Sequence, residues 1–295
     1  MSRSRFLLAA LAVLGAVGSC ASVDRKTQIT VALASETEVP QELDAFVLRV
    51  LSTRTGELRF SNDYFPKSGR DFPTTLAVIP LDEDSLGSPV RIELEGLKDG
   101  RVFLKRQAVI SYSEGRNLLL SMPLRMACFQ FRDCGPSATC AGGECVPVML
   151  EPSSLMDYDP GLVFGSEGAC FDEEACLPDG IEVEVQEDCS FAIPAGVGSG
   201  TGNVSIQWAV APNRILALDA DDAQEGWTRL ADDRGRLSKG VCDSHFQRRG
   251  SDGLLLVPDF AERVYFSASC ASKTNRLPYC LSARTQHAGI GAIRR

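Results

Sequence analysis

Apolar and polar residues alternate with a period of two along much of the chain. The pattern is clearest where Val90, Ile92 and Leu94 alternate with charged residues, and such alternation predicts β-strands with one buried and one solvated face. Asp99-Gly100 lies between two of these runs and predicts a hairpin turn. The alternating apolar positions before the first internal cysteine are Ile29, Val31, Leu33, Phe46, Leu48, Val50, Val90, Ile92, Leu94, Leu118, Leu120 and Met122.

Two long stretches of the chain carry this pattern. Residues 27–126 contain no cysteine and hold about seven short strands, which resembles an immunoglobulin-like or fibronectin-III-like sandwich in architecture. Residues 170–280 repeat the alternation around Val183 and Ile206 and contain several cysteines. We therefore predict an all-β protein, with an N-terminal β-sandwich at 27–126, a short disulfide-rich connector at 127–150 and a second disulfide-bonded β-rich domain at 170–280.

The remaining segments of the chain lack this periodicity. Residues 151–169 combine proline, serine and glycine and predict a linker, and residues 281–295 predict a frayed basic tail. No stretch after residue 20 approaches the apolar run of about 18 residues that a membrane-spanning helix needs.

The N-terminus has the features of an export signal at residues 1–19. Arg3 and Arg5 precede an apolar run at 6–18, which as a helix rises about 20 Å and so is too short to span a bilayer core of about 30 Å. The run ends in Val-Gly-Ser-Cys at residues 17–20. This ending resembles the lipobox of bacterial lipoproteins, in which small residues precede a cysteine.

The lipobox resemblance implies where in the cell the protein is located and how it is attached to the membrane. It implies that Cys20 carries a diacylglycerol thioether and becomes the acylated N-terminus, with residues 20–26 as a tether to the membrane. Ala21 stands where an aspartate would imply retention in the inner membrane, so the resemblance implies the outer membrane, on either its periplasmic or its surface face. Several acyl chains hold a protein durably. Ordinary secretion, with cleavage near Ser19 and a free Cys20, is the alternative.

The number of cysteines fits this predicted location. The chain has 11, and lipidation of one leaves an even number, as expected for an exported protein with disulfides. We predict that Cys170 pairs with Cys176 and that Cys270 pairs with Cys280, which leaves Cys189 for Cys242. The disulfide candidates are Cys128, Cys134, Cys140, Cys145, Cys170, Cys176, Cys189, Cys242, Cys270 and Cys280.

Four of these cysteines lie close together in residues 127–150. A segment this short cannot build an apolar core, so crosslinks must order it. The spacing C-x5-C-x5-C-x4-C resembles the first half of an EGF-like module, and that resemblance implies the pairs Cys128–Cys140 and Cys134–Cys145. A zinc site is the competing interpretation, but structural zinc sites use shorter C-x2–4-C spacings and reduced thiolates.

Composition and charge narrow the classes of function. The chain has 295 residues, with 30 basic and 39 acidic side chains and a formal net charge of −9. This acidic balance argues against a nucleic-acid partner, because such proteins carry a basic face. With only two histidines, His245 and His287, a histidine-based metal site or catalytic triad is disfavoured. We predict no cofactor and no catalytic residue.

Two features of the second domain are candidates for binding. Asp219, Asp221, Asp222 and Glu225 could hold Ca²⁺, which takes several oxygen ligands, and a solvated acidic loop is the alternative. Trp227 lies in a polar stretch, where an exposed ring could stack on a sugar.

These observations together favour an envelope lipoprotein that acts without catalysis, as a binding, adhesion or structural module. Its expected partners are the membrane, through the acyl anchor, and a surface glycan or an envelope protein. The alternative is an extracytoplasmic hydrolase with a carboxylate-based site in the second domain, where two carboxylates would lie about 5–10 Å apart.

Overall fold

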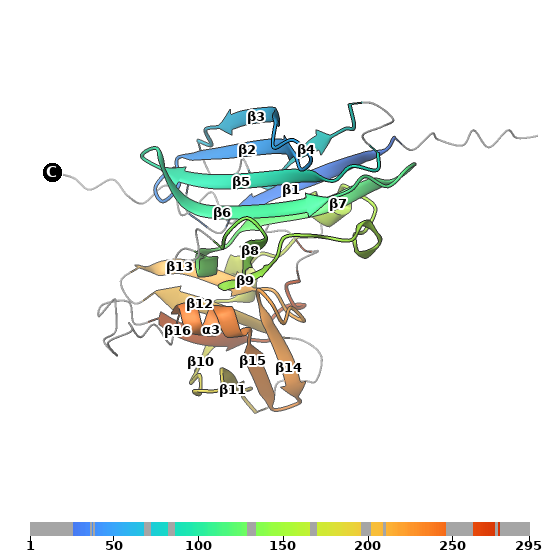
Figure 1. Ribbon diagram of the computed structural model, residues 1–295. Helices are drawn as coiled ribbons and strands as arrows, with labels where there is room; N and C mark the ends of the chain where they lie inside the picture. The colour runs from blue at the N-terminus through green and yellow to red at the C-terminus, as the bar shows by residue number, and fades with distance from the viewer. Residues whose placement is uncertain are drawn as a thin grey trace, which may run out of the picture.

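The computed structural model of this protein is built almost entirely from β-strands (Figure 1). Among the residues that it describes, the longest helix is α3 (Lys239–His245), with seven residues, so the prediction of an all-β protein is confirmed. No helix in this part of the chain is long and apolar enough to cross a membrane. Cys20, with the rest of the predicted export signal, and the predicted tail lie outside the description. The structure describes residues 26–35, 37, 39–67, 72–81, 86–128, 134–165, 170–195, 202–208, 211–245, 262–274 and 277.

Two sheets face each other in the predicted N-terminal sandwich. One has the strand order β4-β1-β7 and the other the order β3-β2-β5-β6. All neighbouring strands are antiparallel except β1 and β7, which are parallel. This order differs from the ABED and CFG sheets of immunoglobulin constant domains, so the likeness is one of architecture. The strands are β1 (Gln28–Ser35), β2 (Ala45–Ser52), β3 (Leu58–Tyr64), β4 (Thr74–Val78), β5 (Val90–Lys98), β6 (Arg101–Ile110) and β7 (Asn117–Leu124).

The core of the sandwich follows from the alternation in the sequence. Every second side chain of the central strands points between the sheets and is buried there. The predicted hairpin joins β5 to β6, and φ is positive at both Asp99 (50°) and Gly100 (71°), as a two-residue type I′ turn requires. The core residues with no exposed surface are Ile29, Val31, Leu43, Leu48, Val90, Ile92, Leu94, Leu104, Ile110 and Leu118.

The connector extends the edge of the four-stranded sheet. It begins with the 3-10 turn η3 (Met126–Cys128) and continues as a hairpin of β8 (Ala138–Ala141) and β9 (Glu144–Pro147). The segment after β9 runs beside β6, where the Val109 N–H donates to the Val148 carbonyl at 2.8 Å and the Leu150 N–H donates to the Val109 carbonyl at 2.9 Å. The end of the connector is therefore attached to β6.

The segment predicted as a linker also packs against the sandwich. It contains the turn η4 (Pro152–Ser154) and the short helix α1 (Gly161–Phe164). Val163 is buried against Ala32 and Leu119, on the outer face of the β1-β7 pair. Residues 151–165 are thus a cover for this sheet rather than a free tether, because the pair exposes apolar side chains on both of its faces.

Two smaller sheets form the second β-rich module. Their orders are β10-β16-β12-β13 and β11-β15-β14, and the rings of Phe191, Trp227 and Phe266 pack together between them. In Figure 1 this module lies below the sandwich, with the connector between the two. Its remaining elements are α2 (Glu173–Cys176), β10 (Ile181–Val183), β11 (Ser190–Ala192), β12 (Asn203–Trp208), β13 (Ala211–Leu218), β14 (Trp227–Ala231), β15 (Arg234–Leu237) and β16 (Glu262–Ser267).

Disulfides crosslink the connector and the second module. The two connector pairs are those that the EGF-like resemblance implied, and the Cys189 pair was also predicted. The described bonds are Cys128–Cys140, Cys134–Cys145, Cys176–Cys270 and Cys189–Cys242.

The prediction that Cys170 pairs with Cys176 is wrong, and so is the pairing of Cys270 with Cys280. Cys176 bonds Cys270 instead. The physical reason is that the end of β16 lies against α2, where the Ser267 hydroxyl donates to the Cys176 carbonyl at 2.5 Å, so the nearest sulfur comes from the far end of the module. Cys170 is disulfide-bonded as well, and Cys280 lies outside the described residues.

Candidate functional site

The outer face of the sheet β3-β2-β5-β6 carries charged side chains in a regular grid. Strand register places Arg49 opposite Glu93 and Glu95 opposite Lys105. These residues alternate with the buried core positions, so they all point to the same, outer side. Opposite and diagonal neighbours on one face of a sheet lie close enough to interact, and the sequence therefore builds an ionic network here.

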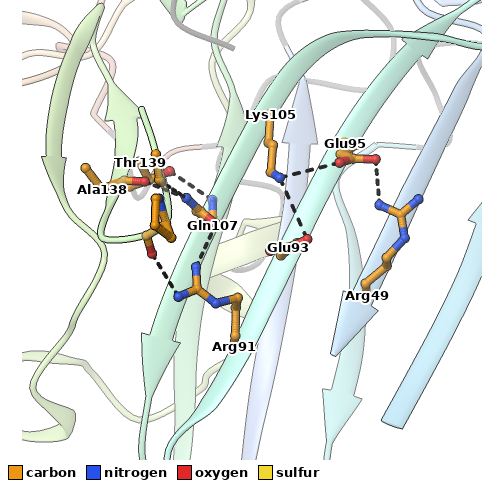
Figure 2. Close-up of polar contacts among 10 residues, drawn as sticks. Arg49, Arg91, Glu93, Glu95, Lys105, Gln107, Ala138 and Thr139 are labelled. Carbon is orange, nitrogen blue, oxygen red and sulfur yellow. Dashed lines mark hydrogen bonds and ion pairs between the residues drawn. The ribbon is translucent and has the colours of Figure 1, made fainter. Parts of the chain in front are cut away.

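Figure 2 shows this network on β2, β5 and β6. Arg49 Nη1 binds Glu95 Oε2 at 2.6 Å, and Lys105 Nζ lies 3.6 Å from Glu95 Oε1 and 3.8 Å from Glu93 Oε2. Among the described residues, Glu95 thus has two cationic neighbours within 4 Å, whereas Glu93 has one, Lys105, which it shares with Glu95.

Gln107 on β6 ties the connector to this face. Its backbone N–H donates to Thr139 Oγ1 at 2.8 Å, and its Nε2 donates to the carbonyls of Gly135 (2.9 Å) and Ala138 (2.5 Å). Its Oε1 accepts a hydrogen bond of 2.8 Å from Arg91 Nη1. One amide side chain therefore fixes both the connector loop and an arginine of β5 (Figure 2).

A pocket of about 400 Å³ lies between the sheet and the connector loop. The loop is closed by the Cys134 disulfide and held by Arg91, whose Nη2 donates to the Pro136 carbonyl at 2.8 Å. The volume falls within the usual range of small-molecule sites. The lining residues are Leu51, Arg91, Glu93, Lys105, Gln107, Cys134, Gly135, Pro136, Ala138, Thr139 and Cys140.

The chemistry of the pocket lining suits binding. Its cysteines are in disulfides, and its one hydroxyl, on Thr139, already accepts a hydrogen bond from the Gln107 backbone. The lining therefore supplies ionic and hydrogen-bonding groups and presents no activated nucleophile. It offers both a cation and an anion to a polar ligand.

The prediction that Trp227 is an exposed binding residue is wrong. Its side chain is 3% exposed and its ring packs edge-on against Phe266, with centroids 5.9 Å apart. Trp227 starts β14 opposite Leu237, and that strand phase turns its ring inward although its sequence neighbours are polar.

The four acidic residues considered for Ca²⁺ do not converge, and no group of metal-ligating side chains occurs within the described part of the chain. Asp219 and Glu225 each bind a basic side chain. Asp222 accepts from the backbone N–H groups of Gln224 and Glu225, while Asp221 is exposed. The calcium prediction is therefore wrong, because the oxygens that would bind the ion are directed elsewhere.

Asp219 and Glu225 instead join the two modules. Asp219 is 1% exposed and binds Lys273 and, at 2.9 Å, Arg125, which directly follows β7. Glu225 Oε1 binds Arg106 of β6 at 2.5 Å. Burial raises the pKa of the Asp219 carboxyl, but the charges of Lys273 and Arg125 and their hydrogen bonds hold that pKa below its ordinary value.

Close backbone contacts complete this junction. In η3, Cys128 belongs to the sandwich core and its neighbour Ala127 belongs to the core of the second module. A side chain at Gly142 would lie 1.7 Å from the Gln224 carbonyl oxygen, and one at Gly240 would lie 1.2 Å from the Gly142 carbonyl oxygen. Glycine at these positions is what lets the connector hairpin approach the second module.

The sequence analysis missed the lining residues Arg91, Glu93, Lys105 and Gln107. In the sequence these residues appear as charged and polar positions of both signs on the solvent-facing side of β5 and β6. A solvent-facing strand shows the same alternation whether or not another segment covers it. Only the placement of the connector loop distinguishes this part of the face as a pocket.

Comparison with known proteins gave no relative for this chain. No protein family, no curated protein and no solved structure matches it.

Proposed function

We propose that this protein is a lipoprotein of the bacterial cell envelope that is anchored in the outer membrane through Cys20 and binds a partner without catalysing a reaction. The observation that supports binding of a partner is the charged pocket between β5, β6 and the connector loop. The lipobox-like ending and the crosslinked cysteines support the anchoring half, since disulfides persist in exported proteins.

The stiffness of the pocket supports binding over turnover. Its walls are a sheet and a loop that is closed by a disulfide and pinned by Gln107. Such a preformed site loses little conformational entropy when a ligand arrives. The acidic side chains at the junction, Asp219 and Glu225, are both engaged by cations, which favours a structural role for them over the carboxylate-based hydrolysis that we considered as an alternative.

Mass spectrometry of the intact protein tests the anchoring half. The native protein and a Cys20→Ala variant are produced in a bacterial host that processes lipoproteins, and thiols are blocked before reduction. We expect the native chain in the membrane fraction, beginning at Cys20, with an added acyl mass and no blocked thiol. The variant should lose the acyl mass and leave that fraction. An uncleaved native chain in the cytosol with free thiols would overturn the proposal.

A glycan array tests the binding half, with the mature chain from residue 21 as the probe and any retained glycan re-analysed after incubation. Saturable binding with recovery of the unchanged glycan is expected if the partner is a glycan. A parallel capture of envelope proteins by the same chain covers the second predicted partner class. Conversion of a bound glycan or protein into a cleaved product would show an enzyme, and retention of neither class would contradict the two predicted partner classes.

A further inference from the structure

We infer that the pocket beside the connector binds a small zwitterion, an α-amino acid or a short peptide, with its carboxylate on Arg91 and its ammonium group on Glu93. This inference deepens the proposed binding function and rests on it, but the site itself is argued from the contacts of these two side chains.

Arg91 supplies a cation that no carboxylate of the described residues neutralises. Its guanidinium donates to Gln107 Oε1 and to the Pro136 carbonyl, both at 2.8 Å, and both acceptors are uncharged. Within the described residues, no carboxylate lies within 4.0 Å of it. A guanidinium has five N–H donors in a fixed plane, so Arg91 is held in one orientation with donors left for a ligand. Planar bidentate recognition of a carboxylate is the chemistry for which arginine is suited.

Glu93 supplies the complementary anion. Its side chain is 16% exposed, and its one ionic partner among the described residues is Lys105, at 3.8 Å, which is longer than a hydrogen bond. Lys105 also serves Glu95. The Glu93 carboxylate accepts no hydrogen bond from the described part of the chain, so it is left able to accept hydrogen bonds from a ligand ammonium group.

The spacing of the two groups fits a ligand that carries both charges. Arg91 and Glu93 are two residues apart on β5, so they share one face and their Cα atoms lie about 7 Å apart. A carboxylate and an ammonium group on one carbon can bridge such side chains with charge-assisted hydrogen bonds of about 2.8 Å at each end.

The opposite charges of the pocket also set its selectivity. A simple carboxylate would pair with Arg91 but would meet the negative charge of Glu93, because the other cation of the lining, Lys105, is shared between Glu93 and Glu95. A simple amine would meet the reverse conflict. A neutral sugar would leave Arg91 without an ionic partner and Glu93 with Lys105 alone, at 3.8 Å. Leu51 and Pro136 are apolar parts of the lining, so an apolar side chain on the ligand, such as the methyl group of alanine, would find apolar contacts there.

Ligand-observed NMR and calorimetry with the mature chain from residue 21, its disulfides intact, test this inference. The probes are L-alanine and L-alanyl-L-alanine, and acetate, ethylammonium and glucose are the controls. The test variants are Arg91→Gln and Glu93→Gln. The matched control is Arg49→Gln, which removes a cation from the same sheet face but from a residue that does not line the pocket.

We expect saturable binding of at least one zwitterionic probe and weaker or no binding of the three control compounds. Each test variant should weaken that binding by about tenfold or more, the usual effect of losing a hydrogen bond to a charged group, and Arg49→Gln should leave it within about twofold. Glu93→Gln keeps the shape of the side chain and removes no hydrogen bond that the structure contains, so its effect cannot come from a displaced loop.

Three results would overturn the inference: no saturable binding of either zwitterion, equal binding of acetate, or equal loss in all three variants. Failure of the inference is distinguishable from failure of the proposed function. A membrane-anchored chain that retains a glycan or an envelope protein, yet ignores both zwitterions, keeps the function and removes this ligand class.

Discussion

The sandwich and the second module differ in what holds their strands together. The sandwich has strands of up to ten residues around one continuous apolar core, and no cysteine lies in its seven strands. As far as the structure describes it, the second module has strands of three to eight residues, a smaller core and the two long-range disulfides Cys176–Cys270 and Cys189–Cys242. Long paired strands bury enough apolar surface to order themselves, whereas short strands depend on crosslinks for the same result.

Removal of a long-range disulfide should have the largest effect on this comparison. The Cys176–Cys270 bond closes 94 residues, and its loss in a Cys176→Ala/Cys270→Ala variant should cost about 4–5 kcal/mol in the chain-entropy account. Hydrogen exchange should then become fast in β12 and β16 and stay slow in β2 and β5. Simultaneous loss of protection in both modules would show that they are one cooperative unit.

The connector gives the matched control. The Cys134–Cys145 bond closes only 11 residues, so its removal should cost about 3 kcal/mol and should affect exchange in the connector loop first.

The buried junction should give the next largest effect. Asp219→Asn keeps the shape of the side chain but removes the negative charge that Asp219 places beside Lys273 and Arg125 in the buried junction, which should cost about 3–5 kcal/mol. Denaturant unfolding followed by circular dichroism measures this loss. Asp243→Asn, in an exposed pair with Lys239, is the control and should cost less than about 1 kcal/mol. Equal losses would mean that the junction charges do not stabilise the contact between the modules.

The pH dependence of stability gives a second test of the contribution that Asp219 makes to the junction. Its pKa in the folded protein lies below the ordinary value of 3.8, so its contribution is present above that value and is lost as the pH falls through the lower, folded pKa. The stability difference between the wild type and Asp219→Asn should stay constant from neutral pH to about pH 4–5 and shrink below that. A difference that already shrinks near pH 6 would contradict the lowered pKa.

A substitution in the ionic network on the outer face of the sandwich should have the smallest effect on stability. Arg49 is 34% exposed and Glu95 keeps Lys105 at 3.6 Å when Arg49 is replaced. Arg49→Gln should therefore change the free energy of unfolding by about 0–1 kcal/mol, measured by the same denaturant titration. A loss of several kcal/mol would show that this face stabilises the sandwich rather than serving a ligand.

Particular residues show how far sequence patterns reach. The alternation around Val90 and Ile206 predicted strands that the structure contains, because period-two burial is a local property of a strand. The same reasoning failed at Trp227, whose polar neighbours suggested exposure, because the pairing of β14 with β15 sets which side of that strand is covered. It also failed for Cys176, whose partner is 94 residues away.

The candidate site was the least predictable part. Arg91 and Glu93 could be assigned to a polar strand face from the sequence, but nothing local indicates that Pro136 would lie over that face. The hydrogen bonds of Gln107 to the connector loop decide it.

By itself the sequence determined which side of each regular strand is apolar, where the tight hairpin between β5 and β6 turns, and that a short cysteine-dense segment needs crosslinks. Only the tertiary structure decided that Cys176 meets Cys270, which aromatic ring is enclosed, and where a cation and an anion face one pocket. The physical reason is that side-chain alternation depends on neighbouring residues alone. The other features arise from contacts between strands that are far apart in the chain, and the register of those strands depends on the packing of the whole molecule.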